Sequence, residues 1–372
     1  TPRTGEAVAE RATTSVADVQ LTRFERLPWR RIVLVLFSIS IITLVVVGTY
    51  KTLTLEGAKD TPEYWFNLVV LGIAQGAIYA MIALGYGLVY GILRMINFAH
   101  GEVFMVGAFG SYFFADAYAK SGFLDANPLA AIAIIMTVAM VCSGLTAFLL
   151  ERIVYRPLRN APRLVPLISA IGAALFLQNS VRGFFGPQSK GYPQPSFLSG
   201  SWSIGGIEVP KMSVATLVVV IVAMLVLQWY VSSTKTGRSM RAVAGDREIA
   251  SLMGIDVDRV IVRTFVIGGL LAGIAGVLYA MTFQSVDFFM GFFPGISAFT
   301  AAVLGGIGSI GGAALGGLLI GVIESVGPFL ILTGFKVPSP ASLKPAFTFL
   351  VLVVVLVYRP SGLLGSGDKE KV

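Results

Sequence analysis

The sequence contains little charge, one cysteine and one histidine. Of its 372 residues only 13% are Asp, Glu, Lys or Arg, whereas 55% are hydrophobic. Because a water-soluble protein of this length needs more polar side chains to cover its surface, the composition predicts an integral membrane protein. The single cysteine, Cys142, excludes an intrachain disulfide. The single histidine, His100, has only one carboxylate, Glu102, and no cysteine near it, so we expect no metal site.

The chain also lacks the phosphate-binding motif of ATPases. No G-x-x-x-x-G-K-[ST] segment occurs, so we expect the chain to bind no cofactor and to be unable to hydrolyse ATP by itself. The net charge of +8 could indicate nucleic-acid binding. However, the basic residues cluster beside apolar segments, where they act as topology signals. The expected partner is therefore the lipid bilayer and not a nucleic acid.

Apolar runs of membrane-spanning length recur along the chain. A spanning helix needs about 20 mostly apolar residues. Runs that reach or approach this length lie at 32–50, 65–93, 96–118, 129–150, 164–181, 213–231, 261–283, 296–330 and 346–358. They predict an all-α integral membrane protein with about 9–10 membrane-crossing segments, including broken or re-entrant helices. Residues 1–64 are expected to form a cytoplasmic tail plus one extra transmembrane helix, and residues 65–372 the main membrane domain.

The distribution of arginines predicts the orientation in the membrane. The basic segments 151–163 and 233–259 belong in the cytoplasm, as do both chain termini. Between these segments, the Gly-, Pro- and Ser-rich stretch 183–211 is an expected outer loop with a short hairpin at "WSIGGIEV". Counting the crossings then requires 296–330 to begin and end outside. We interpret this run as two half-helices joined by a break at "GGIGSIGG".

A second apolar run is interrupted at "MINFAHGE", where polar residues predict a helix break near Asn97. Two interrupted segments in separate halves of a transporter-like chain indicate a substrate site near the membrane midplane. The residues expected to form the breaks or to line a path beside them are Asn97, His100, Gly101, Glu102, Gly305, Gly306, Gly308 and, as a secondary candidate, Glu324.

Each of these residues has a structural alternative. Any one glycine can simply let two helices approach closely. We interpret His100 and Glu102 as bracing the broken helix, with contact to a substrate as an additional role. Glu324 is costly in lipid unless it faces protein or water, which makes it a candidate for a polar path.

The largest inner loop contains a short amphipathic pattern. Residues from Arg247 to Met253 read as a helix that ends at Gly254, and its expected contact residues are Arg247, Glu248, Ala250, Leu252 and Gly254. One interpretation is a helix lying on the lipid surface. The other is a docking helix for a cytoplasmic partner.

Several separate motifs resemble one family. The segments are "MINFAHGEVFMVGA", "ERIVYRPLR", "LISAIGAALFLQN", "GRSMRAVAGDREIASLMGIDVDRV", "AFTAAVLGGIGSIGGAALGGLLIGVIE" and "PSGLLG". Together they resemble the membrane permease subunit of Liv-type ABC importers for branched-chain amino acids. The resemblance runs from about residue 65 to residue 372. The extra helix before it lies outside the expected core pattern.

The resemblance implies a bacterial inner-membrane subunit with several partners. These are a homologous second permease, two cytoplasmic ATPases that use the ATP, and an extracytoplasmic substrate-binding protein. The spacing from Glu248 to Gly254 resembles the E-A-A-x-x-x-G motif that engages such ATPases, with Ile249 in place of the first Ala. In such a permease, Glu102 or freed carbonyls would face the substrate ammonium and a half-helix N-terminus its carboxylate.

Three other functions remain open at this point. A permease for urea or short amides would share the architecture. An intramembrane enzyme built on His100 and Glu102 would need an activated nucleophile, and none stands beside them. A passive channel would not need the docking element that ends at Gly254.

Overall fold

The computed structural model describes residues 29–54, 61–159, 161–162, 164–359 and 361–365. The expected cytoplasmic tail and the chain beyond residue 365 lie outside the described residues. Among the described residues, eight helices are long and apolar enough to cross a membrane, and the apolar helix at Phe292–Gly305 is shorter. The expected all-α membrane protein with broken helices is therefore confirmed.

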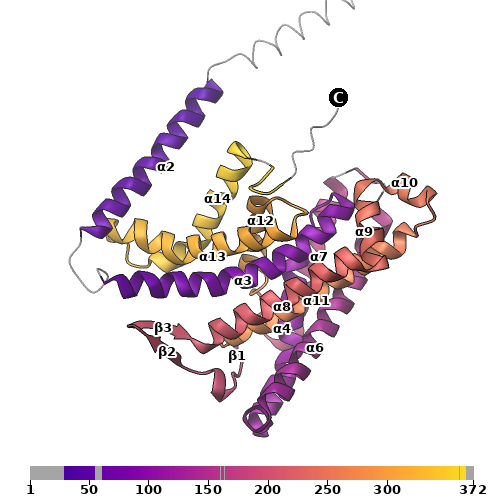
Figure 1. The fold of residues 1–372 in the computed structure, drawn as a ribbon, viewed down its shortest axis with the longest axis horizontal. Helices are drawn as coiled ribbons and strands as arrows, with labels where there is room; N and C mark the ends of the chain where they lie inside the picture. Colours follow the sequence, from indigo (N-terminus) through magenta and orange to yellow (C-terminus); the bar gives the residue numbers. More distant parts are fainter. Residues whose placement is uncertain (1–28, 55–60, 160, 163, 360, 366–372) are drawn as a thin grey trace, which may run out of the picture. The chain divides into compact units, whose positions relative to one another are not determined.

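The apolar runs are largely helical (Figure 1). The longer helices are α2 (Trp29–Leu53), α3 (Pro62–Leu93), α4 (His100–Lys120), α6 (Pro128–Leu149), α7 (Leu164–Phe185), α8 (Lys211–Ser233), α11 (Val257–Phe283), α13 (Ile310–Leu332) and α14 (Lys344–Tyr358). The shorter ones are α5 (Phe123–Ala126), α9 (Lys235–Gly245), α10 (Arg247–Leu252) and α12 (Phe292–Gly305).

Tighter or wider helical turns and short strands complete the fold. A π-helical turn, η1 (Leu150–Tyr155), extends α6, and 3-10 turns follow at η2 (Arg156–Leu158), η3 (Ser196–Leu198), η4 (Thr333–Phe335) and η5 (Pro340–Leu343). The strands are β1 (Lys190–Gly191), β2 (Ser201–Ile204), β3 (Ile207–Pro210) and β4 (Ser285–Val286). Strands β2 and β3 pair antiparallel, which confirms the expected hairpin, and β1 pairs with β4.

Helix α2 and residues 330–338 form one compact unit, which is described here by itself. Gly48 lies directly against the Ile331 carbonyl, since a Cβ at Gly48 would come within 2.5 Å of that oxygen. The Gly334 amide donates to Thr52 Oγ1 at 2.8 Å. Small residues thus let α2 pack closely on this segment near its C-terminal end.

In the second unit, α3 and α13 pack antiparallel through small residues. A Cβ at Gly321 would lie 2.3 Å from the Gly72 carbonyl oxygen, and one at Gly317 would lie 2.5 Å from the Ala80 backbone. These small residues recur four apart on each helix, the spacing that brings helix backbones together in membranes. Ser325 adds a hydrogen bond across the interface, donating to the Leu68 carbonyl at 2.7 Å.

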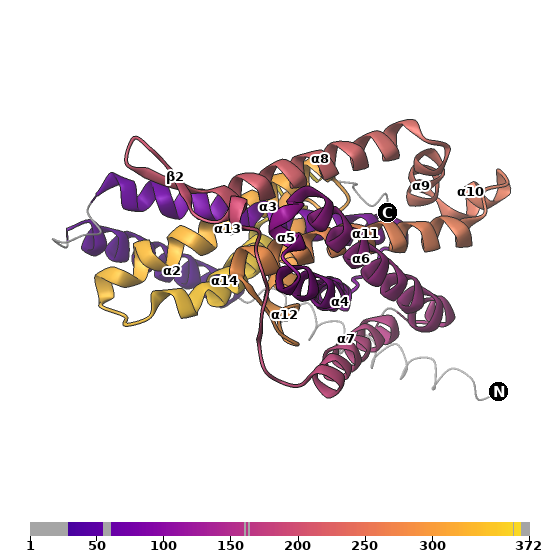
Figure 2. The ribbon, with the colours of Figure 1, turned by 90° about the horizontal axis from the view of Figure 1, so that it is seen from below.

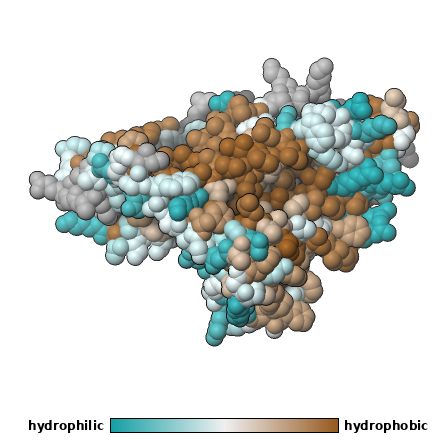
Figure 3. Space-filling view, turned by 60° about the horizontal axis from the view of Figure 1, so that its bottom comes forward, coloured by the Kyte–Doolittle hydropathy of each residue, from teal (hydrophilic) through white to brown (hydrophobic). Residues whose placement is uncertain are grey.

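The buried centre of the second unit lies where α11 packs on α3, α4 and α6, and both ribbon views show α6 and α11 side by side (Figure 1, Figure 2). A Cβ at Gly273 would come within 2.6 Å of the Ala139 carbonyl on α6. Ser143 donates to the Val103 carbonyl of α4 at 2.8 Å. The outer faces of α6, α7 and α8 carry large exposed apolar side chains such as Leu145, and hydrophobic residues cover much of the face in Figure 3. Such faces suit lipid contact.

Hydrogen bonds that involve the segments between helices fall into two groups, one at each end of the helices. At one end, the loop between α7 and α8 is tied to α5, where the Ser196 amide donates to Asp125 at 2.7 Å, and to α3, where the Glu208 amide donates to Asn67 at 3.0 Å. At the other end, the turn after α6 contacts the start of α11, where Arg156 donates to Asp258 at 2.8 Å. Each of these hydrogen bonds therefore joins segments that the sequence places on the same side of the membrane.

The close packing of α3 on α13 makes a direct prediction. Gly321→Leu forces side-chain atoms into the backbone of α3, so we expect it to lower the melting temperature of the purified chain in detergent by several degrees, because overpacking costs about 1–3 kcal/mol or more. Gly183→Leu on α7 is the matched control, since a Cβ there meets nothing within 4 Å. Equal melting temperatures for the two variants would contradict the packing described.

Candidate functional site

The break between α3 and α4 is held by Asn97. Helix α3 ends at Leu93, Arg94 adopts a left-handed conformation with φ of 52°, and α4 begins at His100. The buried Asn97 side chain accepts from the Ala99 amide at 3.1 Å and from the Tyr155 hydroxyl at 2.9 Å. The expected break near Asn97 is present, and the Asn97 side chain braces it.

The break between α12 and α13 is held by the C-terminal segment. Gly306 and Gly308 have φ values of 102° and 94°, which favour glycine because side chains are strained there. The carbonyls of Leu304 and Gly305, which the helix end leaves free, accept from the Leu363 and Leu364 amides at 2.8 and 2.9 Å. The break expected at "GGIGSIGG" is confirmed. The role of "PSGLLG" as its backbone partner was not predicted.

The two breaks lie close together. A narrow crevice is lined by residues from both connections and from the helices beside them: Tyr86, Tyr90, Ile96, Phe299, Ala302 and Ile307. A Cβ at Gly87 would lie 3.6 Å from the Gly308 amide nitrogen. Gly87 is about 9 Å along the helix from the end of α3. The breaks therefore lie nearer one end of α3 than its middle.

A cavity of about 520 Å³ adjoins the first break. Its walls come from five helices, α3, α4, α7, α12 and α14, and from the connections that precede α4 and α12. The lining residues are Tyr86, Phe98, Gly101, Glu102, Ile171, Ala174, Leu175, Gln178, Phe289, Gly291, Phe292, Gly295, Ile296, Phe299, Phe349 and Leu352. Most of these side chains are apolar. The polar side chains in the lining are Tyr86, Glu102 and Gln178.

Glu102 is the charged group of this cavity. Its side chain is 4% exposed, and its Oε2 has no hydrogen-bond partner. A buried carboxylate oxygen without a partner is costly, and a cationic ligand would offset that cost. Glu102 is therefore the candidate residue of this cavity for contact with a positively charged group.

His100 does not line the cavity. It is buried against α3, where a Cβ at Gly85 would lie 2.2 Å from its Nε2, and its ring stands edge-on to Tyr86 with 4.9 Å between centroids. Its Nε2 has no hydrogen-bond partner. The structure thus separates the two residues of the motif, with His100 packed toward α3 and Glu102 facing the cavity.

Glycines bring α4 and α12 into backbone contact beside Glu102. A Cβ at Gly101 would lie 2.5 Å from the Gly291 carbonyl, and one at Gly291 would lie 2.9 Å from Glu102 Oε2. Gly101 is therefore a packing residue as well as part of the lining. Sequence reasoning missed Gly291, Gly295 and Gln178, although Gln178 is the first of three consecutive polar residues that follow an apolar run.

Glu324 lies outside this cavity. The buried carboxylate accepts hydrogen bonds from Tyr79 at 2.7 Å, from Ser297 at 2.5 Å, and from Gln75 and Thr348. These donors belong to α3, α12 and α14, so Glu324 on α13 ties four helices together. Its hydrogen bonds indicate a structural role, and its place beside a transport path stays a prediction.

The predicted inner helix forms α10. Asp246 caps it by accepting from the amides of Glu248 and Ile249, and Gly254 ends it with φ of 81°. Ala250 is buried, whereas Leu252 is 87% exposed. Ile249 and Met253 are also exposed, so α10 presents an apolar ridge to its surroundings.

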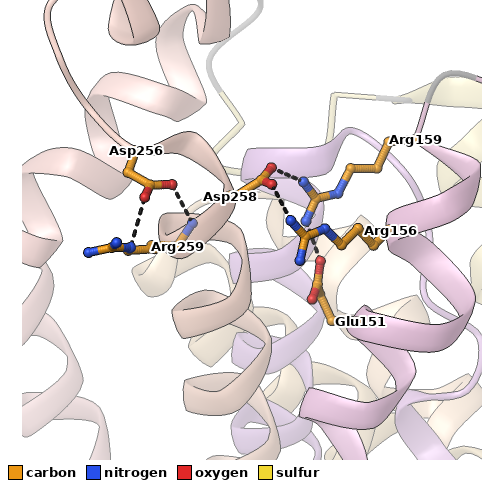
Figure 4. Close-up of polar contacts among 6 residues, drawn as sticks. All are labelled: Glu151, Arg156, Arg159, Asp256, Asp258 and Arg259. Atoms are coloured by element: carbon orange, nitrogen blue, oxygen red, sulfur yellow. Dashed lines mark hydrogen bonds and ion pairs between the residues drawn. The ribbon is translucent and has the colours of Figure 1, made fainter.

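An ion-pair network holds the turn after α6 against α11 (Figure 4). Asp258 lies between Arg156 and Arg159, and Arg159 also pairs with the fully buried Glu151. Tyr155, which holds Asn97, belongs to the same turn. The network therefore fixes the residue that braces the first break.

The comparisons with known proteins agree on one family. A family model described as branched-chain amino acid transport system / permease component matches residues 68–356. The permease protein LivH of Escherichia coli K12 is 41% identical over 314 residues, which is 83% of this chain and 98% of that protein. BraD of Pseudomonas aeruginosa is 42% identical over 316 residues, 84% of this chain and 100% of that protein.

More distant likenesses were also found. LivM of Methanocaldococcus jannaschii is 24% identical over 80% of this chain and 93% of that protein. Among solved structures, PsaBC from Streptococcus pneumoniae in complex with Fab matches 80% of this chain and 91% of that chain at 16% identity, with a TM-score of 0.39. The family match and the relatives at 41–42% identity show that the chain belongs to the permease component family of branched-chain amino acid transport systems.

Proposed function

We propose that the chain is the transmembrane permease subunit of an ATP-driven importer for branched-chain amino acids. The observation that carries this proposal is the cavity, whose apolar walls surround one buried carboxylate, Glu102, with an unpartnered oxygen. Its volume of about 520 Å³ falls within the usual range for small-molecule sites. The relatives named above are themselves branched-chain amino acid permeases.

Each part of a branched-chain amino acid has a matching part of the cavity. The Glu102 carboxylate meets the ammonium group. The N-terminus of α12, beside Gly291 and Phe292, carries the positive end of the helix dipole and faces the carboxylate. The phenylalanine and aliphatic walls accept the side chain.

The alternative of a urea or short-amide permease fits the cavity less well. Urea offers several donors and acceptors but little apolar surface, and polar groups in an apolar site are costly without partners. The polar side chains of the lining are Tyr86, Glu102 and Gln178. Such a lining favours a ligand with an apolar body.

The proposal includes partners for the chain. A homologous second permease completes the path, an extracytoplasmic binding protein delivers the substrate, and two cytoplasmic ATPases use the ATP. The exposed ridge of Ile249, Leu252 and Met253 on α10 supports an ATPase contact. In this scheme the chain is a transport subunit, residues 65–372 form its permease domain, and the helix within 1–64 is an addition to that domain.

The proposed location is the bacterial inner membrane, with both termini in the cytoplasm. The arginine-rich segments after α6 and around α9 and α10 lie inside by the positive-inside rule. Contacts within each of the two groups of connections support this assignment. The break between α12 and α13 contacts the C-terminal segment and lies toward the same side.

The orientation can be tested by cysteine labelling. In a Cys142→Ser background, Ser239→Cys lies at a partly exposed position on α9, so we expect an impermeant thiol reagent to modify it only after the cells are opened. A matched Ser203→Cys in the β2–β3 hairpin is expected to react in intact cells. Labelling of Ser239→Cys in intact cells would overturn the orientation.

The role of Glu102 can be tested with two substitutions in the complete transporter. Direct recognition of the ammonium predicts that Glu102→Gln and Glu102→Leu each lower uptake in proteoliposomes at least tenfold, because both remove the charge. Tolerance of Gln with loss in Leu would instead mean a bracing role. Normal uptake by the Leu variant would exclude both.

The docking role of α10 can be tested at Leu252. Because this side chain is almost fully exposed, Leu252→Asp is expected to leave the melting temperature of the purified chain unchanged while preventing co-purification of the ATPase subunits. Ser239→Asp on α9 serves as the control, since it adds the same charge elsewhere on the loop. Full co-purification with Leu252→Asp would refute docking through α10.

A further inference from the structure

Arg247 links the α10 loop to the first helix break. Although it is the first residue of α10, its side chain turns inward, and its Nε and Nη2 donate to the Ile92 carbonyl at 3.0 and 2.5 Å. Ile92 lies in the last turn of α3, where carbonyls have no partner within the helix. The guanidinium therefore binds α3 at the point where the helix breaks.

This contact is electrostatically favourable in two ways. A cation near the C-terminus of a helix interacts with the negative end of the helix dipole. The planar guanidinium also directs two N–H groups at one oxygen, which fixes its direction more strongly than an ammonium would. Arg247 has no carboxylate within ion-pair distance among the described residues, and its guanidinium binds the Ile92 carbonyl instead.

Both sides of the break connect directly to the cavity. Tyr86 precedes Ile92 on α3, and Glu102 follows it at the start of α4, after the connection. Both Tyr86 and Glu102 line the cavity. The connection itself is held on its other side by the Tyr155 hydroxyl on Asn97. A displacement of α10 would therefore move the end of α3 against a connection that is fixed elsewhere.

We propose that Arg247 is a positioning residue that transmits movement of α10 to the cavity, by binding the Ile92 carbonyl at the end of α3. This inference rests on the proposed function for the role of α10. Under this proposal, α10 and the residue after it have two sides. Ile249, Leu252 and Met253 face outward to a partner, and Arg247 faces inward to the end of α3. The short helix α10 thereby connects the partner contact to the end of α3.

The chain provides a matched control in the same loop. Arg241 on α9 also donates to helix-end carbonyls, those of Val231 and Ser232 at the end of α8. Helix α8 does not lead into either break. A general effect of losing an arginine from the loop would therefore appear in Arg241→Gln as well.

The first measurement uses the purified chain without partners. We expect Arg247→Gln to speed hydrogen exchange of the amides in the last turn of α3 about tenfold, because the end of the helix loses a charged hydrogen bond. Arg241→Gln should leave that turn unchanged, and Arg247→Lys should restore part of the protection. Equal exchange in the wild-type and Arg247→Gln chains would overturn the link.

The second measurement uses the complete transporter in proteoliposomes. Arg247→Gln is expected to lower the amount of substrate taken up per ATP hydrolysed at least tenfold, whereas Arg241→Gln keeps the wild-type ratio. An unchanged ratio in Arg247→Gln, or an equal fall in both variants, would refute transmission through Arg247. If the wild-type transporter itself does not couple uptake to ATP, the proposed function fails, and the exchange measurement still decides whether Arg247 holds α3.

Discussion

Backbone groups freed at a helix break must find partners when the break lies inside a membrane protein. Water is scarce there, so each unpaired amide or carbonyl costs several kcal/mol. At the first break, Asn97 and Arg247 supply these partners, and at the second, the C-terminal segment does so through Leu363 and Leu364. The arrangement of helices around the cavity depends on these few hydrogen bonds.

The partners of the two breaks come from segments that the proposed function places on the cytoplasmic side. Arg247 belongs to α10, and Tyr155 belongs to the turn that ion pairs hold against α11. The cavity residue Glu102 lies two residues into α4, directly after the first break. A site formed in this way can respond to events at the cytoplasmic surface without long-range changes in the buried helices.

The sequence predicted the helices and both breaks because hydrophobic length and clustered glycines are local signals. It also predicted α10 and its end at Gly254, since amphipathic spacing and a left-handed glycine are local as well. It could not reveal that Glu102 faces a cavity while His100 packs on Gly85, because that difference depends on which helix lies on each side. The same limit explains Glu324, whose four donors come from positions distant in the sequence.

The central claim is that the two breaks, which adjoin each other beside the cavity, shift relative to one another during transport. It is tested most directly by the distance between spin labels at Met95 and Ile307, one in each connection, in the complete transporter with and without ATP bound to the ATPases. The account predicts that this distance changes between the two states while the distance between labels at Leu145 on α6 and Leu270 on α11 stays constant. A constant distance between the breaks in both states would contradict it.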